Sequence, residues 1–278
     1  MAEEQNSGCS PEACSSCAHA GSCESRKKDM KAPANKYSQV KKVIGVISGK
    51  GGVGKSMVTA SLARMMVEQG YTVGIMDADI TGPSIPKMYG VHANAVGSEE
   101  GMFPCVAADG TKIMSVNLLL ERESDPVIWR GPVIAGVVTQ FWTDVMWGDL
   151  DFLLVDMPPG TGDVPLTVFQ SLPVDGVVIV TSPQDLVQMI VEKAYNMAKQ
   201  MNIPVLGIVE NYSYLECPDC GKRISVFGES HIDEIAAGLG VEVLGKMPID
   251  PKLAEAVENE KFYEASNKYL KNIVEKFR

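Results

Sequence analysis

Residues 49–56 are Gly49-Lys50-Gly51-Gly52-Val53-Gly54-Lys55-Ser56 and match the phosphate-binding pattern G-x-x-x-x-G-K-[ST]. The apolar, β-branched run over 43–48 that precedes them predicts a buried strand. An apolar pattern with helical spacing follows as far as Gln69, and Gly70 is a typical helix C-cap. A strand, a glycine-rich loop and a helix in this order surround an anion with backbone N–H groups and a helix N-terminus. The stretch therefore predicts a nucleotide site.

Two lysines are expected to act on the phosphates of the nucleotide. Lys55 should reach the β- and γ-phosphates, and the hydroxyl of Ser56 should bind Mg²⁺. Lys50 adds a second cation directly after the first glycine of the loop. Met57 is the last residue that we assign to the nucleotide-binding loop.

The bulk composition limits the possible classes of protein. A chain of 278 residues with 45% hydrophobic residues can bury one good core, which favours a single α/β domain. A formal charge of −10 argues against a dedicated nucleic-acid binder. No apolar stretch approaches the length of a membrane span, and the polar N-terminus is no signal peptide. We therefore expect a cytoplasmic protein that binds neither nucleic acid nor membrane, with cysteines reduced unless they hold metal.

Strand and helix patterns alternate from Val43 onward, with a hairpin signal at Asp109-Gly110. This alternation predicts an α/β, doubly wound, mostly parallel sheet with its ligand at the carboxyl ends of the strands. Residues 1–40 have few large apolar side chains, which predicts a disordered arm followed by a flexible linker over 26–39 and an ATPase domain over 41–278. The expected strands are 43–48, 73–77, 152–156, 176–181, 205–210 and 242–246, and the expected helices are 56–69, 132–147, 164–171, 184–201, 229–238 and 260–277.

Three carboxylates follow predicted strands at the functional edge of the sheet. Asp77 and Asp79 come at the end of the second strand, where Mg²⁺ and an attacking water would lie, although either could instead cap the following turn. Asp156 ends a hydrophobic strand, which is the Walker B pattern of a carboxylate that acts on Mg²⁺. The run Met157-Pro-Pro-Gly-Thr-Gly-Asp163 suits a switch that senses the γ-phosphate.

The cysteines form two groups. Four of them, in a segment unable to build a core, predict a metal site that could hold an iron–sulfur cluster or zinc, with His19 as a possible zinc ligand. Cys217-Pro-Asp-Cys220-Gly is half of a site that needs four thiolates, so the arm or a second subunit must supply the other two. Cys105 is most simply a small buried hydrophobe. The four arm cysteines are Cys9, Cys14, Cys17 and Cys23.

Together, the loop with its extra Lys50, the 157–163 run, the Cys-Pro-x-Cys pair and the cysteine-rich arm resemble the Mrp/ApbC family over residues 9–278. These proteins are iron–sulfur cluster carrier ATPases with a deviant Walker A loop like that of MinD and ParA. The resemblance implies a homodimer in which Lys50 contacts nucleotide across the interface and Lys55 and Asp79 serve hydrolysis, Asp79 by positioning water. Asp77 and Asp156 would support Mg²⁺.

For the nucleotide base, the resemblance implies contacts from Asn211, Pro248 and Asp250, although from the residues alone Asn211 is more simply a turn former. The chain has no Asn-Lys-x-Asp guanine motif, which favours ATP. The resemblance also implies a labile 4Fe–4S cluster bridged by Cys217 and Cys220 of two subunits, a second cluster in the arm, and transfer to apo iron–sulfur proteins. Cys9 lies closer to Cys14 than the family pattern has it, which puts Cys9 in doubt as a ligand.

Two other classes compete with the carrier. A MinD/ParA-like positioning ATPase would act through a membrane or DNA surface. The apolar stripe of the predicted 260–277 helix could lie on a membrane or simply pack on the sheet. An electron-transfer reductase like the nitrogenase iron protein would place a cysteine close to the switch that senses the γ-phosphate. Residues 157–163, which form this predicted switch, contain no cysteine.

Overall fold

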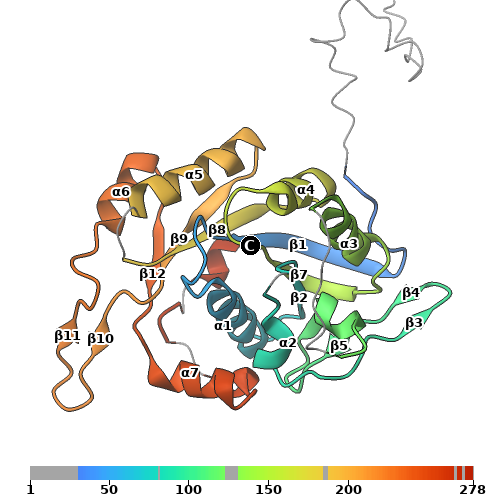
Figure 1. Ribbon diagram of the computed structural model, residues 1–278, viewed down its shortest axis with the longest axis horizontal. Coiled ribbons are helices and arrows are strands. Elements are labelled where there is room, and N and C mark those ends of the chain that lie inside the picture. Colours follow the sequence, from blue (N-terminus) through green and yellow to red (C-terminus); the bar gives the residue numbers. More distant parts are fainter. Residues whose placement is uncertain are drawn as a thin grey trace, which may run out of the picture. The chain divides into compact units, whose positions relative to one another are not determined.

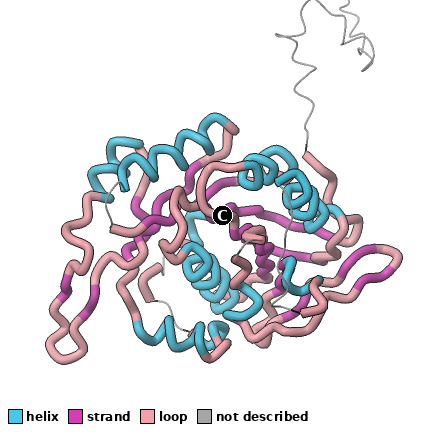
Figure 2. Tube along the Cα trace, in the orientation of Figure 1, coloured by secondary structure: helices cyan, strands magenta, loops and turns pink. Residues whose placement is uncertain are grey.

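The computed structural model describes residues 31–80, 82–122, 131–183, 187–265, 268–270 and 273–277. One compact unit spans Ala32–Arg278 and is built on an eight-stranded sheet. Figure 1 shows the order of its elements, and Figure 2 shows helices on both sides of the central strands. The predicted α/β fold with a mostly parallel, doubly wound sheet is confirmed.

The sheet has the strand order β12-β9-β8-β1-β7-β2-β6-β5, and all neighbours pair in parallel except β5 and β6. These strands are β1 (Ser38–Ile47), β2 (Val73–Asp77), β5 (Cys105–Val106), β6 (Lys112–Ser115), β7 (Gly148–Asp156), β8 (Gly176–Thr181), β9 (Val205–Glu210) and β12 (Val243–Lys246). Two separate hairpins pair β3 (Gly97–Ser98) with β4 (Gly101–Met102) and β10 (Leu215–Glu216) with β11 (Arg223–Ile224).

Helices cover both faces because successive side chains of each strand point to opposite sides of the sheet. In β1, Val43 and Ile47 join one buried cluster, whereas Ile44 and Val46 join the other. The first cluster lies under α3 (Gly131–Thr143), α4 (Asp163–Ser171), α5 (Val187–Gln200) and α6 (Ile232–Leu239). The second lies under α1 (Lys55–Glu68), α2 (Ile85–Met88) and α7 (Pro251–Glu258). Short 3₁₀ turns occupy Val116–Leu119, Phe262–Glu264 and Val274–Phe277.

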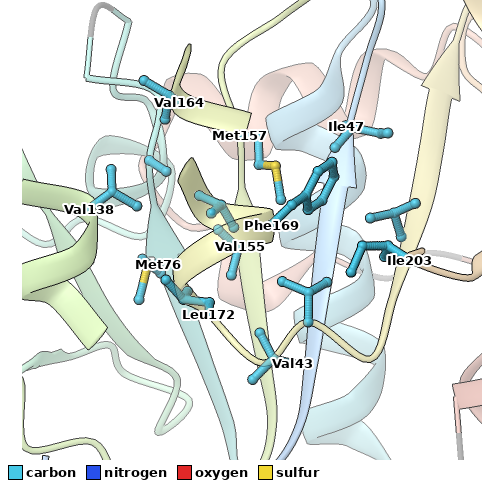
Figure 3. Close-up of a cluster of buried hydrophobic side chains, with 14 of the residues drawn as sticks. Val43, Ile47, Met76, Val138, Val155, Met157, Val164, Phe169, Leu172 and Ile203 are labelled. Carbon is cyan, nitrogen blue, oxygen red and sulfur yellow. The ribbon is translucent and has the colours of Figure 1, made fainter. Parts of the chain in front are cut away.

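The first cluster shows how tightly the helices meet the sheet. Val155 and Met157 lie close to Phe169 of α4, and Val43 of the neighbouring strand β1 belongs to the same cluster (Figure 3). A methyl group added at Gly45 would come within 2.7 Å of the Met157 side chain. The strands can therefore be apolar on both faces, as the uninterrupted hydrophobic runs predict.

The predicted helix over 260–277 is wrong. The helix in this region is α7, which begins earlier because Asp250 accepts a hydrogen bond from the Lys252 N–H and caps a helix that has Pro251 in its first turn. It ends before Glu260, whose φ is +58°. Beyond it, the described residues form only two 3₁₀ turns, and the backbone is already extended at Ala265.

The apolar residues predicted for that helix are nevertheless buried. Leu270, Val274 and Phe277 are at most 3% exposed and join the cluster beneath α1 and α7. Packing on the sheet is therefore the correct alternative for these side chains, and a membrane-surface stripe is not. None of the helices in the described ranges is both long enough and apolar enough to cross a membrane.

Several predicted boundaries shift. Strand β1 starts at Ser38, and residue Ala32 exchanges hydrogen bonds with Ser171 and Trp142, so the described part of the 26–39 linker is docked on the domain. Helix α3 stops at Thr143 because Val145 forms a bridge with Met102. The hairpin predicted at Asp109-Gly110 is confirmed and joins β5 to β6.

Candidate functional site

The phosphate-binding loop and two carboxylates meet at one edge of the sheet. Strand β1 leads into the loop, β7 ends in Asp156 and β2 ends in Asp77. The strands are neighbours in the order β1-β7-β2, and Asp77 pairs in register with Asp156. Because parallel neighbours end together, residues far apart in the sequence come to one edge, as predicted.

Asp156 is the centre of this edge. It is fully buried, and its carboxylate lies 2.7 Å from the Nζ atom of Lys55. The hydroxyl groups of Ser56 and Thr59 donate hydrogen bonds to its two oxygens at 2.5 and 2.7 Å. A buried carboxylate is tolerated when a cation and hydroxyl groups satisfy it in this way. The Walker B carboxylate and the two polar residues of the loop therefore form one contact network.

The loop has a backbone path that glycine makes possible. Gly52 and Gly54 have φ values of +78° and +76°, in the left-handed region. A methyl group at Gly54 would lie 2.1 Å from the Nδ2 atom of Asn211 and 2.9 Å from the hydroxyl of Tyr212. One at Gly52 would meet nothing within 4 Å. The loop is thus pressed against the end of β9 at Gly54 and open to the outside at Gly52.

A pocket of about 310 Å³ opens over this loop. Its lining includes Gly51–Met57, Asp79 and Pro159. The Oγ atom of Ser48, another lining residue, is buried without a hydrogen-bond partner in the described part of the chain. A glycine-rich cradle, a lysine, a serine hydroxyl and a carboxylate are the donor set that a nucleotide with Mg²⁺ needs, so the residues fit this group.

The two other acidic residues differ in environment. Asp77 is buried, and its carboxylate accepts hydrogen bonds from the Asp79 and Ile85 N–H groups and from the hydroxyl of Ser115. Burial, followed by repulsion from Asp156, raises the pKa of Asp77 to about 8. Asp79 is half-buried, lines the pocket, and has its carboxylate 3.9 Å from Lys55 Nζ. Asp79 therefore faces the space over the loop, whereas Asp77 holds the turn behind it.

The three residues expected to contact the base lie at different places. Asn211 is fully buried behind the loop and donates from Nδ2 to the Val53 carbonyl at 3.0 Å. Its Oδ1 atom has no hydrogen-bond partner among the described residues. Pro248 is buried, and Asp250 caps α7 and accepts a hydrogen bond from Tyr269. Asn211 thus positions the loop, and the adenine contacts stay predictions.

Lys50 and the neighbouring glycines occupy the exposed rim of the loop. Lys50 is exposed, while Gly49 is half-buried against α5. A methyl group at Gly49 would come within 2.6 Å of the Ile190 carbonyl, so this position also needs glycine. The position of Lys50 is compatible with a contact to a second subunit, which stays a prediction.

The second cysteine group lies on a projecting hairpin. Strands β10 and β11 form its arms, and the Cys217–Cys220 pair forms the turn between them, away from the main sheet (Figure 1). The Cys217 N–H donates to the Lys222 carbonyl, and the Gly221 N–H donates to the Cys217 carbonyl. Gly221 has a φ of +70°, which favours glycine in this turn. The spacing therefore produces a closed turn that presents both thiols.

The chemistry of this turn favours a thiolate. Backbone N–H groups of Cys220 and Asp219 lower the pKa of the Cys217 thiol. Cys220 is exposed, and no group of three or more potential metal ligands lies together in the described residues. One half-buried and one exposed thiol supply two potential ligands, and the completion of a four-thiolate site stays a prediction. Cys105 differs, because partial burial raises the pKa of its thiol.

The arm cysteines Cys9, Cys14, Cys17 and Cys23, and His19 with them, lie outside the described residues. Two residues of the described site were not expected from the sequence. Thr59 lies one helical turn after Lys55, and that spacing could have predicted its contact with Asp156. Glu210 ends the hydrophobic strand β9 just as Asp156 ends β7, so the same pattern could have identified it as a buried carboxylate.

Comparison with known proteins gives a consistent result. The family model ParA, described as NUBPL iron-transfer P-loop NTPase, matches residues 39–278. An iron–sulfur cluster carrier protein of Clostridium perfringens is 47% identical over 263 residues, which cover 89% of this chain and 92% of the relative. One of Methanocaldococcus jannaschii is 45% identical over 278 residues, covering 95% and 96%.

Solved structures agree with the fold. A nucleotide-binding protein of Archaeoglobus fulgidus in complex with ADP has 43% identity and a TM-score of 0.75, covering 86% of this chain and 93% of that one. The cell division ATPase MinD of Pyrococcus furiosus has 21% identity and a TM-score of 0.61, covering 85% and 96%. The second likeness shows the fold alone.

Proposed function

Since the chain belongs to the NUBPL iron-transfer P-loop NTPase family, we propose that it is an ATP-binding carrier that holds an iron–sulfur cluster and passes it to apo-proteins. The observation that carries the proposal is the presence of two sites in one compact unit. One is the loop with Lys55 and Asp156, and the other is the hairpin turn with the half-buried Cys217 and the exposed Cys220. The names of relatives at 45–47% identity support the same function.

In the nucleotide site, the chain supplies charge and position. Lys55 brings a buried ammonium to the pocket, and Ser56 brings a hydroxyl that is already held by Asp156. Bound Mg·ATP would supply the phosphoanhydride bond and a metal that neutralises its charge. Asp79 faces the pocket and is our choice for orienting the attacking water. Because Asp79, a weak base, is the one carboxylate among the described residues that line the pocket, we expect slow Mg²⁺-dependent turnover.

In the cysteine site, the cluster is cargo. Four thiolates hold a 4Fe–4S cluster, and one hairpin offers two. We propose that two subunits supply Cys217 and Cys220 each, so that the protein works as a homodimer with Lys50 near the second nucleotide. A thiolate of lowered pKa that is open to solvent can be replaced on iron by a thiolate of the recipient protein. A second cluster in the arm and a cytoplasmic location stay predictions.

The test is transfer of a loaded cluster. Protein reconstituted under anaerobic conditions should carry iron and sulfide and activate an apo-protein acceptor, at a rate that differs between nucleotide-free, ADP-bound and ATP-bound states. Asp79→Asn should bind ATP without hydrolysing it and should hold one of these rates permanently. A protein that takes up zinc alone, or that does not bind ATP, would contradict the proposal.

A further inference from the structure

The cysteine hairpin is anchored to the domain through one buried carboxylate. The cysteine segment follows Ser213 and Tyr214, whose backbone groups are hydrogen-bonded to Met247 and Ile249, and the chain returns to the domain at Ser230. Both serine hydroxyls donate to the Glu210 carboxylate, Ser213 to Oε2 at 2.5 Å and Ser230 to Oε1 at 2.7 Å. Glu210 is only 1% exposed and is the last residue of β9. The Glu210 side chain thus links the two ends of the segment that carries Cys217 and Cys220.

The residue after Glu210 contacts the nucleotide site. Asn211 donates from Nδ2 to the Val53 carbonyl of the phosphate-binding loop at 3.0 Å. Its side chain also lies so close to Gly54 that a methyl group there would be 2.1 Å away. Two consecutive residues therefore face opposite ways, one toward the loop that would bind phosphate and the other toward the base of the cysteine segment.

Beyond its two ends, the cysteine segment has few buried contacts that could fix its position. Between Glu216 and Glu229 all residues except the half-buried Cys217 are exposed. An exposed segment with fixed ends takes its position mainly from those ends, because few buried contacts compete with them. The carboxylate at its base, by contrast, is buried, and separating it from its hydroxyl donors would leave a buried charge unsatisfied.

We propose that Glu210 is a positioning residue that couples the state of the phosphate-binding loop to the placement, and hence the reactivity, of the Cys217–Cys220 pair. A shift of the Val53 carbonyl moves Asn211, and the peptide that joins Asn211 to Glu210 moves with it. Both serines then follow the carboxylate. The inference rests on the proposed function, since it assigns to ATP a route within one subunit to the thiols that would hold the cluster.

The experiment measures how nucleotide changes thiol reactivity in the full-length, reduced, cluster-free protein. Alkylation of Cys217 and Cys220 by iodoacetamide is followed by mass spectrometry, with and without a non-hydrolysable ATP analogue and Mg²⁺. In the protein without substitutions, the alkylation rates with and without the analogue should differ by about fivefold or more. This factor is the lower end of the usual coupling between two sites. Glu210→Gln keeps the volume but removes the charge, and Ser230→Ala removes one donor. Both should reduce the ratio to less than about twofold while analogue affinity changes by less than about threefold.

The matched control is Glu229→Ala, which removes an exposed carboxylate next to Ser230 and should keep the full ratio. Ser230→Ala removes one hydroxyl from a half-buried residue, so it serves as the test if Glu210→Gln does not fold. A ratio near one in the unmodified protein, or an unchanged ratio in both variants, would overturn the coupling. Iron loading and analogue binding are measured on separate, unalkylated aliquots of the same preparations. If the protein without substitutions neither loads iron nor binds the analogue, the proposed function is contradicted instead.

Discussion

The nucleotide site and the cysteine hairpin are built in opposite ways. At the nucleotide site, Asp156 is fully buried and receives an ion pair and two hydroxyl donors from the same helix. At the hairpin, Cys220 is exposed and the turn is held by its own backbone. A site that must bind the same phosphates repeatedly gains from fixed, buried donors, whereas a site that must release its cargo needs open ligands. The described contacts of Asp156 all come from one chain, whereas one hairpin offers only two of the four thiolates that a 4Fe–4S cluster takes.

The largest expected effect would separate the two sites outright. Cys217→Ser with Cys220→Ser should remove the bridged cluster, so that iron after anaerobic reconstitution falls by about four atoms per dimer. ATP binding should remain, because the pocket does not include the hairpin. Cys105→Ser is the matched control and should keep its iron. Full iron content in the double variant would show that the cluster binds elsewhere.

The reciprocal change tests the nucleotide site. Lys55→Ala removes the buried ammonium and should weaken ATP binding by about 2–3 kcal/mol, or roughly 30- to 150-fold, as for hydrogen bonds to charged groups. Iron binding at the hairpin should persist. Equilibrium titration with a fluorescent ATP analogue measures the loss, and circular dichroism checks that the variant is folded. Lys199→Ala, on the exposed side of α5, is the control and should bind normally.

A smaller effect should distinguish the two faces of the loop itself. Gly52→Ala places a side chain at positive φ in open space and should lower the free energy of unfolding by about 1–2 kcal/mol. Gly54→Ala carries the same backbone strain and also displaces Asn211, which should cost about 1–3 kcal/mol more. Urea unfolding of both variants gives the difference. Equal losses would mean that the loop does not press on the end of β9.

The last prediction concerns the pH dependence of stability. Asp77 has a pKa of about 8 in the fold against an ordinary value of 3.8, so the native state keeps a proton there that the unfolded chain has lost. Between these values the contribution of Asp77 to stability therefore falls as pH rises, and it is constant above about 8. Asp77→Asn cannot lose a proton, so its unfolding free energy should improve relative to the unmodified protein from pH 5 to pH 8.

Urea unfolding at these two pH values, in EDTA and without nucleotide, measures this trend. Glu229→Gln, an exposed carboxyl change, should run parallel to the unmodified protein. A parallel course for Asp77→Asn would show that Asp77 is ionised in the fold.

Short-range patterns were enough for the nucleotide site. The loop at 49–56 and the strand ending in Asp156 each have a local signature, and adjacency of parallel strands brings them together. The resemblance to the iron–sulfur cluster carrier ATPases is likewise confirmed by the family match. The contact between Glu210 and Ser230 has no such signature, because two serines and a glutamate are common and only the closed fold brings them together.

The C-terminal region shows the opposite limit. The apolar spacing from Leu270 to Phe277 is helical, and these side chains are indeed buried. Periodicity identifies the residues that pack but not the backbone that carries them there. Instead, helix α7 begins after the cap at Asp250 and ends before Glu260, which has a left-handed backbone conformation. The Asp250-Pro251 pair is a local helix-start signal that the apolar periodicity does not contain.

Strand β5 has a consequence for assembly. It is only two residues long, runs against its neighbour β6 and ends the sheet on that side. An edge strand this short offers too few free N–H and C=O groups to recruit a strand from another chain. At this edge the fold is thus protected from amyloid-like growth and from dimers that share one continuous sheet. Self-association on this side of the sheet has to use loops and side chains instead, so a ligand that binds those loops could control it.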